Sequence, residues 1–249
     1  MFKLKDKVVL ITGGLGIQGP EHTKAFKEAG ARVVVTDVVE GAEFKLDVTS
    51  EESINRAVKG VLKKYGRIDV LVNNAGATPG GQKQASAEVK DQVLGNWEHI
   101  LRVNLTGVWL CSQIIGEVMV KQGKGSIINL ASIYGVVGPD FRIYEESKYR
   151  GKKMGLPAAY AASKGGVISL TRYLATYWAD KGVRVNSVTP GGIYDKQSEA
   201  FVNAYSRNVP LGRMAKKDEV SGAILYLASD LASYVTGENM VIDGGLTIR

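Results

Sequence analysis

The sequence predicts a doubly wound α/β fold, that is, a parallel sheet of the Rossmann type with helices on both faces, and three observations lead to this expectation. Short β-branched apolar runs alternate along the chain with longer segments of helical spacing. The runs VVLIT, RVVVT and SIINLA are apolar at nearly every position, as burial on both faces of a parallel sheet requires. A glycine cluster follows the first run, where a strand would pass into a helix.

The elements follow one another in a regular order. The first strand is expected at 7–12, and a helix from about 17 to 29 ends at Gly30. Ser50 is the expected N-cap of the second helix. The further strands are expected at 32–36, 69–72, 126–131 and 183–188, and the further helices at 50–65, 96–121 and 158–180. Strands separated by helices imply right-handed crossovers and a parallel sheet.

The bulk composition indicates one globular domain over residues 1–249. The chain is 45% hydrophobic and 23% charged, and no linker, repeat or low-complexity tract divides it. A single cysteine, Cys111, and a start without a long apolar segment lead us to expect a cytoplasmic protein that does not insert into membranes.

The net charge of +7 has two interpretations. The basic residues are spread along the chain except for one cluster at 148–153, so an ordinary solvated surface is the simpler account. An anionic substrate is the alternative. No recognition motif accompanies the charge, so we expect no nucleic-acid partner.

The turn after the first strand predicts a dinucleotide site. It reads TGGLGIQG, with glycines at 13, 16 and 19, which permit a tight turn and let a pyrophosphate approach the start of the helix. Asp37 ends the second strand about 18 residues later, where a carboxylate would accept hydrogen bonds from the adenosine ribose and repel a 2′-phosphate. Valines follow it, and Leu15 stands in the turn where a basic residue would favour NADP. The sequence therefore favours NAD over NADP.

Tyr160 and Lys164 are the predicted centre of the chemistry, because residues four apart share one face of a helix. This spacing is common by itself. Here Ser132 follows an apolar strand, a second strand runs into NNAG at 73–76, and Asn104 lies in the segment RVNLTG. Ligands of parallel sheets bind outside the carboxyl ends of the strands, where most of these residues fall.

Together these motifs make the chain resemble the short-chain dehydrogenase/reductase family, from Lys7 to about Gly245, with sugar and gluconate dehydrogenase-like members among its nearest types. The resemblance implies that Ser132 polarises the substrate oxygen, that Tyr160 is the general acid/base and that Asn104 holds a water in a proton relay. Lys164 would bind the nicotinamide ribose and lower the tyrosine pKa. The cofactor contacts that it implies are Gly13, Leu15, Gly16, Ile17, Asp37, Asp47, Val48, Asn74, Ala75, Gly76, Tyr160, Lys164, Pro190, Gly191 and Ile193.

The activity implied by this resemblance is an NAD-dependent oxidoreductase that interconverts a secondary alcohol and a ketone on a sugar, sugar acid or polyol. A 3-oxoacyl carrier-protein reductase is the alternative, and a non-catalytic dinucleotide-binding protein is an alternative of another class. His22 and His99 lack the spacing of metal ligands, so we expect no metal. Relatives are commonly tetramers, and the apolar and aromatic residues in 170–178 suit a homo-oligomer, a tetramer or dimer.

Three features depart from the family pattern. The glycine turn has the spacing of the extended subclass. An insertion of about fifteen residues, at 139–157, contains a second Tyr-x-x-x-Lys, Tyr144 to Lys148. Glycines and Pro157 interrupt any helix that starts at Tyr144, so Tyr160 is the preferred acid/base. The insertion is expected to be a loop beside the substrate. Asp195 stands where many relatives carry threonine, within a segment, 193–214, that resembles a substrate lid.

Overall fold

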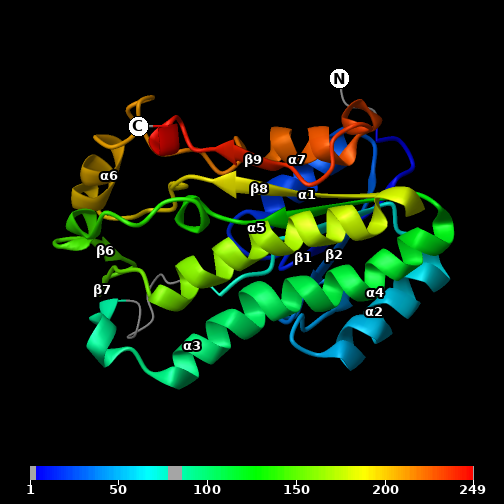
Figure 1. Ribbon diagram of the computed structural model, residues 1–249, viewed down its shortest axis with the longest axis horizontal. Coiled ribbons are helices and arrows are strands. Elements are labelled where there is room, and N and C mark those ends of the chain that lie inside the picture. The colour runs from blue at the N-terminus through cyan, green and yellow to red at the C-terminus, as the bar shows by residue number, and fades with distance from the viewer. Residues whose placement is uncertain (1–3, 78–85, 249) are drawn as a thin grey trace.

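The computed structural model describes residues 4–77 and 86–248, which form a seven-stranded sheet with helices on both faces (Figure 1). Every pair of neighbouring strands in this sheet is parallel, so the predicted doubly wound fold is confirmed. In their spatial order the strands are β3 (Phe44–Lys45), β2 (Arg32–Asp37), β1 (Val8–Thr12), β4 (Val70–Asn73), β5 (Gly125–Leu130), β8 (Val183–Pro190) and β9 (Asn239–Ile242). The chain reverses its direction of winding between β1 and β4, where ligands of such sheets bind.

Two hydrophobic cores sandwich the sheet. Helices α2 (Glu51–Tyr65), α4 (Gly107–Gln122) and α5 (Ala158–Trp178) cover one face, and α1 (Gly19–Glu28) and α7 (Ser221–Ala228) cover the other (Figure 1). Leu10 and Leu71 point into the first core, whereas their chain neighbours Ile11 and Val72 point into the second. Both faces of the central strands β1, β4 and β5 are therefore buried, which explains their nearly continuous apolar runs.

The longest helical stretch runs from Leu94 to Gln122 as α3 (Leu94–Leu101), a π-helical segment η3 (Arg102–Thr106) and α4. By length and composition alone this stretch would be apolar enough to cross a membrane. Half of its most apolar window is buried inside the protein, and it packs against α2, α5, β4 and β5. The helical stretch is apolar because it packs against the sheet and the neighbouring helices.

The sequence predicts that the first helix begins at about residue 17, whereas α1 begins at Gly19. Pro20 occupies the first turn of the helix, where proline is tolerated, and the glycine turn extends to Gln18. Elements that the sequence did not suggest are the short strands β3 and β9 and the helices α6 (Glu199–Ser206) and α7. The remaining single turns are η2 (Val89–Asp91), η4 (Ile133–Gly135), η6 (Ala179–Lys181), η7 (Asp230–Ala232) and η8 (Leu246–Ile248).

The insertion is more ordered than the expected loop. It contains a short turn, η5 (Phe141–Tyr144), and an antiparallel hairpin of β6 (Lys148–Tyr149) and β7 (Lys152–Lys153). Arg150 and Gly151 join the two strands with φ of 50° and 78°, the pair of positive angles that a tight type I′ hairpin turn needs. Strands of two residues are too short for an alternating pattern, so the sequence carried no signal for them.

Candidate active site

The glycine turn brings the ends of β1 and β4 into close contact. Gly13 has a φ of +60°, and a Cβ atom there would lie 2.6 Å from the Cα of Ala75. The Asn74 side chain donates hydrogen bonds to the carbonyl oxygens of Thr12 (3.1 Å) and Gly13 (2.8 Å). Only glycine fits at position 13, because both its backbone angle and its neighbour exclude a side chain.

The start of α1 is shaped to receive an anion. A Cβ atom on Gly19 would lie 2.4 Å from the carbonyl oxygen of Gly14, so the first turn of the helix packs directly on the glycine turn. No side chain caps this helix, Pro20 has no N–H, and the N–H groups of Glu21 and His22 donate to the Gln18 carbonyl, so the Gly19 N–H is the group that the first turn offers to a pyrophosphate. These residues fit a dinucleotide.

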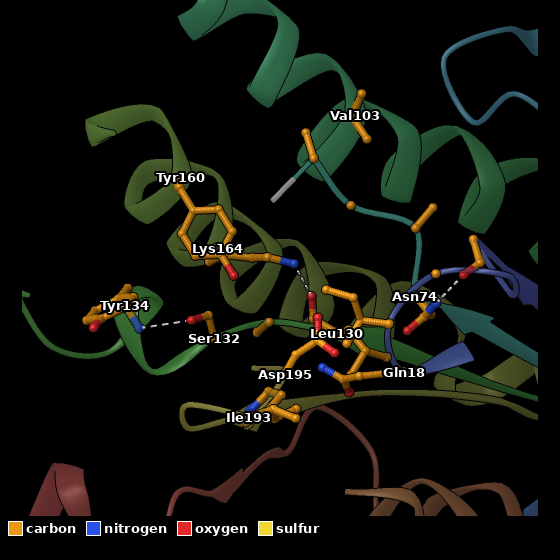
Figure 2. A pocket seen from close by; sticks show the side chains of 18 of the residues that line it. Gln18, Asn74, Val103, Leu130, Ser132, Tyr134, Tyr160, Lys164, Ile193 and Asp195 are labelled. Atoms are coloured by element: carbon orange, nitrogen blue, oxygen red, sulfur yellow. Dashed lines mark hydrogen bonds between the residues drawn. The ribbon is translucent and has the colours of Figure 1, made fainter. Parts of the chain in front are cut away.

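Gln18 is a pocket residue that the sequence reasoning missed. It precedes α1 and lines the same pocket as Gly16 and Ile17. Its side-chain oxygen is buried and accepts no hydrogen bond within the described part of the chain. Figure 2 shows the Gln18 side chain on the side of the pocket where Ile193 and Asp195 lie. Its polar side chain among the apolar residues of the turn is a sequence signal that points to it.

Asp37 holds the glycine turn from the end of β2. Its carboxylate accepts hydrogen bonds from the N–H groups of Leu15 (3.0 Å) and Val38 (2.7 Å). Asp37 and Val38 line the pocket, and the side chains of Val38 and Val39 are exposed. Leu15, a predicted cofactor contact, is not among the lining residues and contributes its N–H to Asp37. The carboxylate thus stands where the sequence predicts the adenosine ribose.

Asp47 and Val48 lie farther along the same wall. The Asp47 carboxylate accepts hydrogen bonds from the N–H and the hydroxyl of Thr49, both at 2.8 Å. A Cβ atom on Gly107 would lie 2.7 Å from the Val48 side chain, so this pair is held against the start of α4. The other predicted cofactor contacts that line the pocket are Asn74, Ala75, Gly76, Pro190, Gly191 and Ile193.

Tyr160, Lys164 and Ser132 meet at the opposite end of the pocket (Figure 2). Ser132 follows β5, and its hydroxyl oxygen accepts a hydrogen bond from the Tyr134 N–H at 3.3 Å. Tyr160 and Lys164 lie one turn apart on α5, with the lysine Nζ 5.8 Å from the centre of the tyrosine ring. The same Nζ donates a hydrogen bond of 2.6 Å to the carbonyl oxygen of Leu130. Helix and strand end therefore present a phenol, an ammonium and a hydroxyl together.

Burial dominates the ionisation of this group. It raises the pKa of Tyr160, and a hydrogen bond with Ser132 acts in the opposite direction. Burial also lowers the pKa of Lys164 to about 8. The lowering of the tyrosine pKa that the sequence led us to expect is thus absent in the protein alone. The physical reason is that the ammonium is directed at Leu130, while the burial of the phenol in the pocket wall disfavours its charged form.

Asn104 lies behind the pocket wall, in the π-helical segment, and is fully buried. Its side-chain oxygen accepts a hydrogen bond from the Ala77 N–H at 2.7 Å, and its nitrogen donates to the Ala77 carbonyl and to the Ser163 hydroxyl, both at 3.3 Å. Ser163 neighbours Lys164. Asn104 therefore connects the long helix to α5 beside the chemistry, although it does not line the pocket itself.

The second Tyr-x-x-x-Lys does not form a comparable pair. Tyr144 ends η5 and is buried, whereas Lys148 lies on β6 and is exposed. The Tyr144 hydroxyl is 2.8 Å from that of Tyr134. The structure thus separates this tyrosine from its lysine and places it in the pocket wall, while Tyr160 and Lys164 share one helix.

The insertion and the 193–214 segment form the remaining wall of a cavity of about 1010 Å³. Tyr144, Tyr149 and Leu156 come from the insertion, and Phe201, Tyr205 and Met214 come from the predicted lid. Lys148, Lys152 and Lys153 are exposed and do not line the cavity. The basic residues of the insertion therefore do not present their charge to a bound substrate.

Asp195 is a nearly buried carboxylate in this wall. The Tyr149 hydroxyl donates a short hydrogen bond to it, Lys217 Nζ lies 2.5 Å from it, and the Arg150 guanidinium lies 3.4 Å away. Burial by itself raises the pKa of the Asp195 carboxyl, but Lys217 and Tyr149 outweigh it and hold the pKa below its ordinary value. The residue is therefore an anion in the pocket wall.

The two histidines lie apart from each other. His22 is buried between α1 and α7, with its Nδ1 2.8 Å from the Ser221 hydroxyl oxygen, and burial lowers its pKa to about 4. His99 is exposed on α3. Within the described residues, no three His, Cys, Asp or Glu side chains gather in a way that could hold a metal ion.

Comparisons with known proteins agree with this geometry. Residues 7–205 match the family model for short chain dehydrogenases. The chain is 38% identical to 3-oxoacyl carrier-protein reductase FabG of Thermotoga maritima, over 99% of this chain and all of that protein. It is 34% identical to D-threitol dehydrogenase of Mycolicibacterium smegmatis, over 100% of this chain and 95% of that protein.

Among solved structures, the fold superimposes on a short chain dehydrogenase from Leptospira borgpetersenii with bound NAD+, with a TM-score of 0.87, 35% identity and coverage of 98% of this chain and 94% of that one. The family match over most of the chain thus accompanies three structural features: the parallel sheet, the glycine turn and the group of Ser132, Tyr160 and Lys164. The chain belongs to the short-chain dehydrogenase/reductase family, whose members are nicotinamide-dependent oxidoreductases that act on CH–OH groups.

Proposed function

We propose that this protein is an NAD-dependent dehydrogenase of a sugar, sugar acid or polyol, with Tyr160 as general acid/base. One observation carries the proposal. A single cavity extends from the Asp37 carboxylate, past the glycine turn, to Ser132, Tyr160 and Lys164. A dinucleotide that enters along Asp37 would present its reactive end to the phenol.

The roles follow from the groups that each residue offers. The bound nicotinamide supplies the hydride acceptor or donor. Tyr160 takes the proton of the substrate hydroxyl in oxidation and returns it in reduction, and Ser132 donates a hydrogen bond to the same oxygen. The Lys164 ammonium has three donors, of which one is used by Leu130, so two remain for ribose hydroxyls. Its charge favours the phenolate form of Tyr160.

The Asp37 carboxylate supports NAD as the cofactor. It lines the cavity at the end of β2, next to valine side chains. A 2′-phosphate at this position would meet a negative charge, and a 2′-hydroxyl would donate a hydrogen bond to it.

Two substrate classes compete. The similarity to D-threitol dehydrogenase supports a polyol. The similarity to 3-oxoacyl carrier-protein reductase supports an acyl thioester, and here the exposed lysines of the β6–β7 hairpin would face an acidic carrier protein. We favour the polyol class because Asp37 disfavours NADP, the cofactor that such reductases usually prefer.

The outer surface supports assembly into a dimer or tetramer. Trp109 on α4 and Tyr173 and Tyr177 on α5 are exposed, and the two tyrosine rings stack with their centres 6.3 Å apart. Large aromatic side chains on neighbouring helices are typical of an interface between subunits. Light scattering that shows only a monomer at micromolar concentration would contradict this. A cytoplasmic location is proposed with it, since Cys111 is a free, buried thiol.

The first experiment is a titration with NADH and with NADPH, followed by nicotinamide fluorescence. Tight binding of NADH and weak binding of NADPH supports the proposal, and a preference for NADPH favours the carrier-protein reductase. Turnover of polyols with NAD is measured next, in the wild type and in Tyr160→Phe. If the two proteins bind NADH equally and neither transfers hydride to any substrate, the protein is a non-catalytic dinucleotide-binding protein.

A further inference from the structure

The end of the cavity that holds the acid/base has an aromatic wall, which the proposed function leaves unexplained. The Tyr160 ring packs against a cluster of buried side chains that includes Tyr144, Phe201 and Tyr205. All three of these rings line the cavity. A substrate that reaches Tyr160 therefore lies beside ring surface, although sugars and polyols carry a hydroxyl group on nearly every carbon.

The three rings form a continuous row in which Phe201 is the middle one. Its centre lies 5.7 Å from that of Tyr144 and 5.8 Å from that of Tyr205, and the ring planes are inclined by 31° and 33°. Phe201 and Tyr205 come from α6, whereas Tyr144 comes from the η5 turn of the insertion. The row thus joins the two segments that build the substrate wall.

Hydrogen bonds hold the two outer rings in place. The Tyr144 hydroxyl is 2.8 Å from that of Tyr134, and Figure 2 shows Tyr134 beside Ser132, away from the cofactor end. The Tyr205 hydroxyl accepts a hydrogen bond from the Gly192 N–H, and a Cβ atom on Gly192 would lie 2.6 Å from the Tyr205 ring. The hydroxyl groups are therefore directed at protein partners, and the rings remain as a surface for a ligand.

Such a surface suits one face of a sugar ring. The face of an aromatic ring carries partial negative charge, and a C–H group whose carbon bears an oxygen carries partial positive charge, so the two attract each other. A six-membered ring with equatorial hydroxyls gathers axial C–H groups on one face. An open-chain polyol has no such face, because its hydroxyls point in all directions around the chain. A ring is also more rigid and loses less conformational freedom on binding.

We propose that the row of Tyr144, Phe201 and Tyr205 binds the C–H face of a six-membered ring, so that the protein selects cyclic polyols and sugars in ring form over open-chain polyols. This inference rests on the proposed function and narrows its substrate class. The reaction is unchanged, since a ring CH–OH becomes a ring ketone, with its hydride passing to NAD and its hydroxyl proton to Tyr160.

The test compares kcat/KM for myo-inositol with that for D-glucitol, at saturating NAD. Both compounds have six carbons and six hydroxyls, and they differ in ring closure. The wild type should prefer the inositol, and Tyr144→Leu and Phe201→Leu should each lower the inositol-to-glucitol ratio by about 3- to 10-fold, the usual contribution of an aromatic contact. Tyr144→Phe is the matched control, because it loses the same hydroxyl as Tyr144→Leu and keeps the ring, so its ratio should stay that of the wild type. NADH titration of each variant checks the cofactor site.

The outcomes separate the inference from the proposed function. If the wild type oxidises D-glucitol at least as well as the inositol, or if both leucine variants keep the wild-type ratio, the aromatic wall does not select rings and the proposed function stands. An equal fall of the ratio in Tyr144→Phe and Tyr144→Leu would assign the effect to the hydroxyl, which also overturns the inference. Turnover of an acyl thioester and of neither polyol overturns the proposed function and this inference with it.

A second measurement needs only the wild-type protein, and so remains decisive if the leucine variants do not fold. Calorimetry gives the dissociation constants of scyllo-inositol and chiro-inositol for the protein saturated with NADH, where no oxidation can occur. All hydroxyls of scyllo-inositol are equatorial, whereas chiro-inositol carries one axial hydroxyl on each face, which keeps its C–H groups off the aromatic wall. The scyllo isomer should bind about 3- to 10-fold more tightly, and equal or weaker binding of this isomer would overturn the proposal.

Discussion

Mild acid should destabilise this protein through His22, which is fully buried and uncharged between α1 and α7. Burial lowers its pKa from 6.5 to about 4, so the unfolded chain binds a proton at a pH where the folded protein does not. The stability that His22 contributes is therefore fully present above pH 6.5 and is lost progressively as the pH falls toward 4. Between about pH 7.5 and about pH 5 the loss amounts to about 2 kcal/mol, at 1.36 kcal/mol per pH unit of difference in proton binding.

The assay is urea unfolding of the wild type and of His22→Gln at several pH values in this range. The glutamine variant does not titrate, so its free energy of unfolding should fall less steeply with acid than that of the wild type. His99→Gln is the control for the replacement of a histidine outside the core, because that side chain is exposed on α3. Identical slopes for the wild type and His22→Gln would refute the reasoning, since the burial of an uncharged imidazole would then have no energetic consequence.

Three further predictions concern the site. Gly19→Ala should weaken NADH binding in a fluorescence titration, since its Cβ would lie 2.4 Å from the Gly14 carbonyl oxygen. Gly222→Ala is the control and should bind NADH as the wild type does, because open space surrounds that glycine. Equal binding by all three proteins would contradict the close packing of α1 on the turn. Tyr144→Phe should retain turnover while Tyr160→Phe loses about 10²- to 10⁴-fold in kcat, the usual contribution of an acid/base group; the reverse order would make Tyr144 the acid/base. Asp37→Ser should lower the affinity for NADH more than that for NADPH, and an unchanged ratio of the two dissociation constants would remove Asp37 from cofactor selection.

The sequence predicts those parts of the fold that depend on local, repeated patterns of residues. Strands β1, β4, β5 and β8 are buried on both sides and β2 is partly buried, and each of the five appears within two residues of its expected bounds. Ser50 is the N-cap of α2 as predicted, its hydroxyl accepting from the Ser53 N–H at 3.2 Å. A cap and a buried strand each depend on a few neighbouring residues, so local reasoning is sufficient for them.

The parts that escaped prediction depend on residues far apart in the chain. The contact of Tyr149 with Asp195 joins positions 46 residues apart, and neither segment contains a local pattern that predicts it. The start of α1 shifted because Pro20 and the close approach of Gly19 to Gly14 outweigh helical spacing. The direction of the Tyr160 pKa depends on burial, which a Tyr-x-x-x-Lys spacing does not report.

The sequence predicted which residues belong to the site more fully than how their side chains are arranged. Ser132, Tyr160 and Lys164 line one cavity together, but Asn104 stands behind its wall and Leu15 supports Asp37 from outside. A motif specifies which residue types recur at a given spacing. It does not specify whether a side chain or only its backbone faces the ligand.

The π-helical segment around Asn104 makes the chain unequally tolerant of changes in length. A π turn holds one residue more than an α turn, so deletion of a single residue within Arg102–Thr106 would let the helix relax to α geometry. The helix on either side of the deletion would keep its phase, but the side chains within the turn would be redirected, and Asn104 would leave Ala77 and Ser163. The insertion, by contrast, adds about fifteen residues without disturbing β5 or α5. Loss or gain of residues during evolution would thus be accepted at the substrate wall and selected against in the middle of this helix.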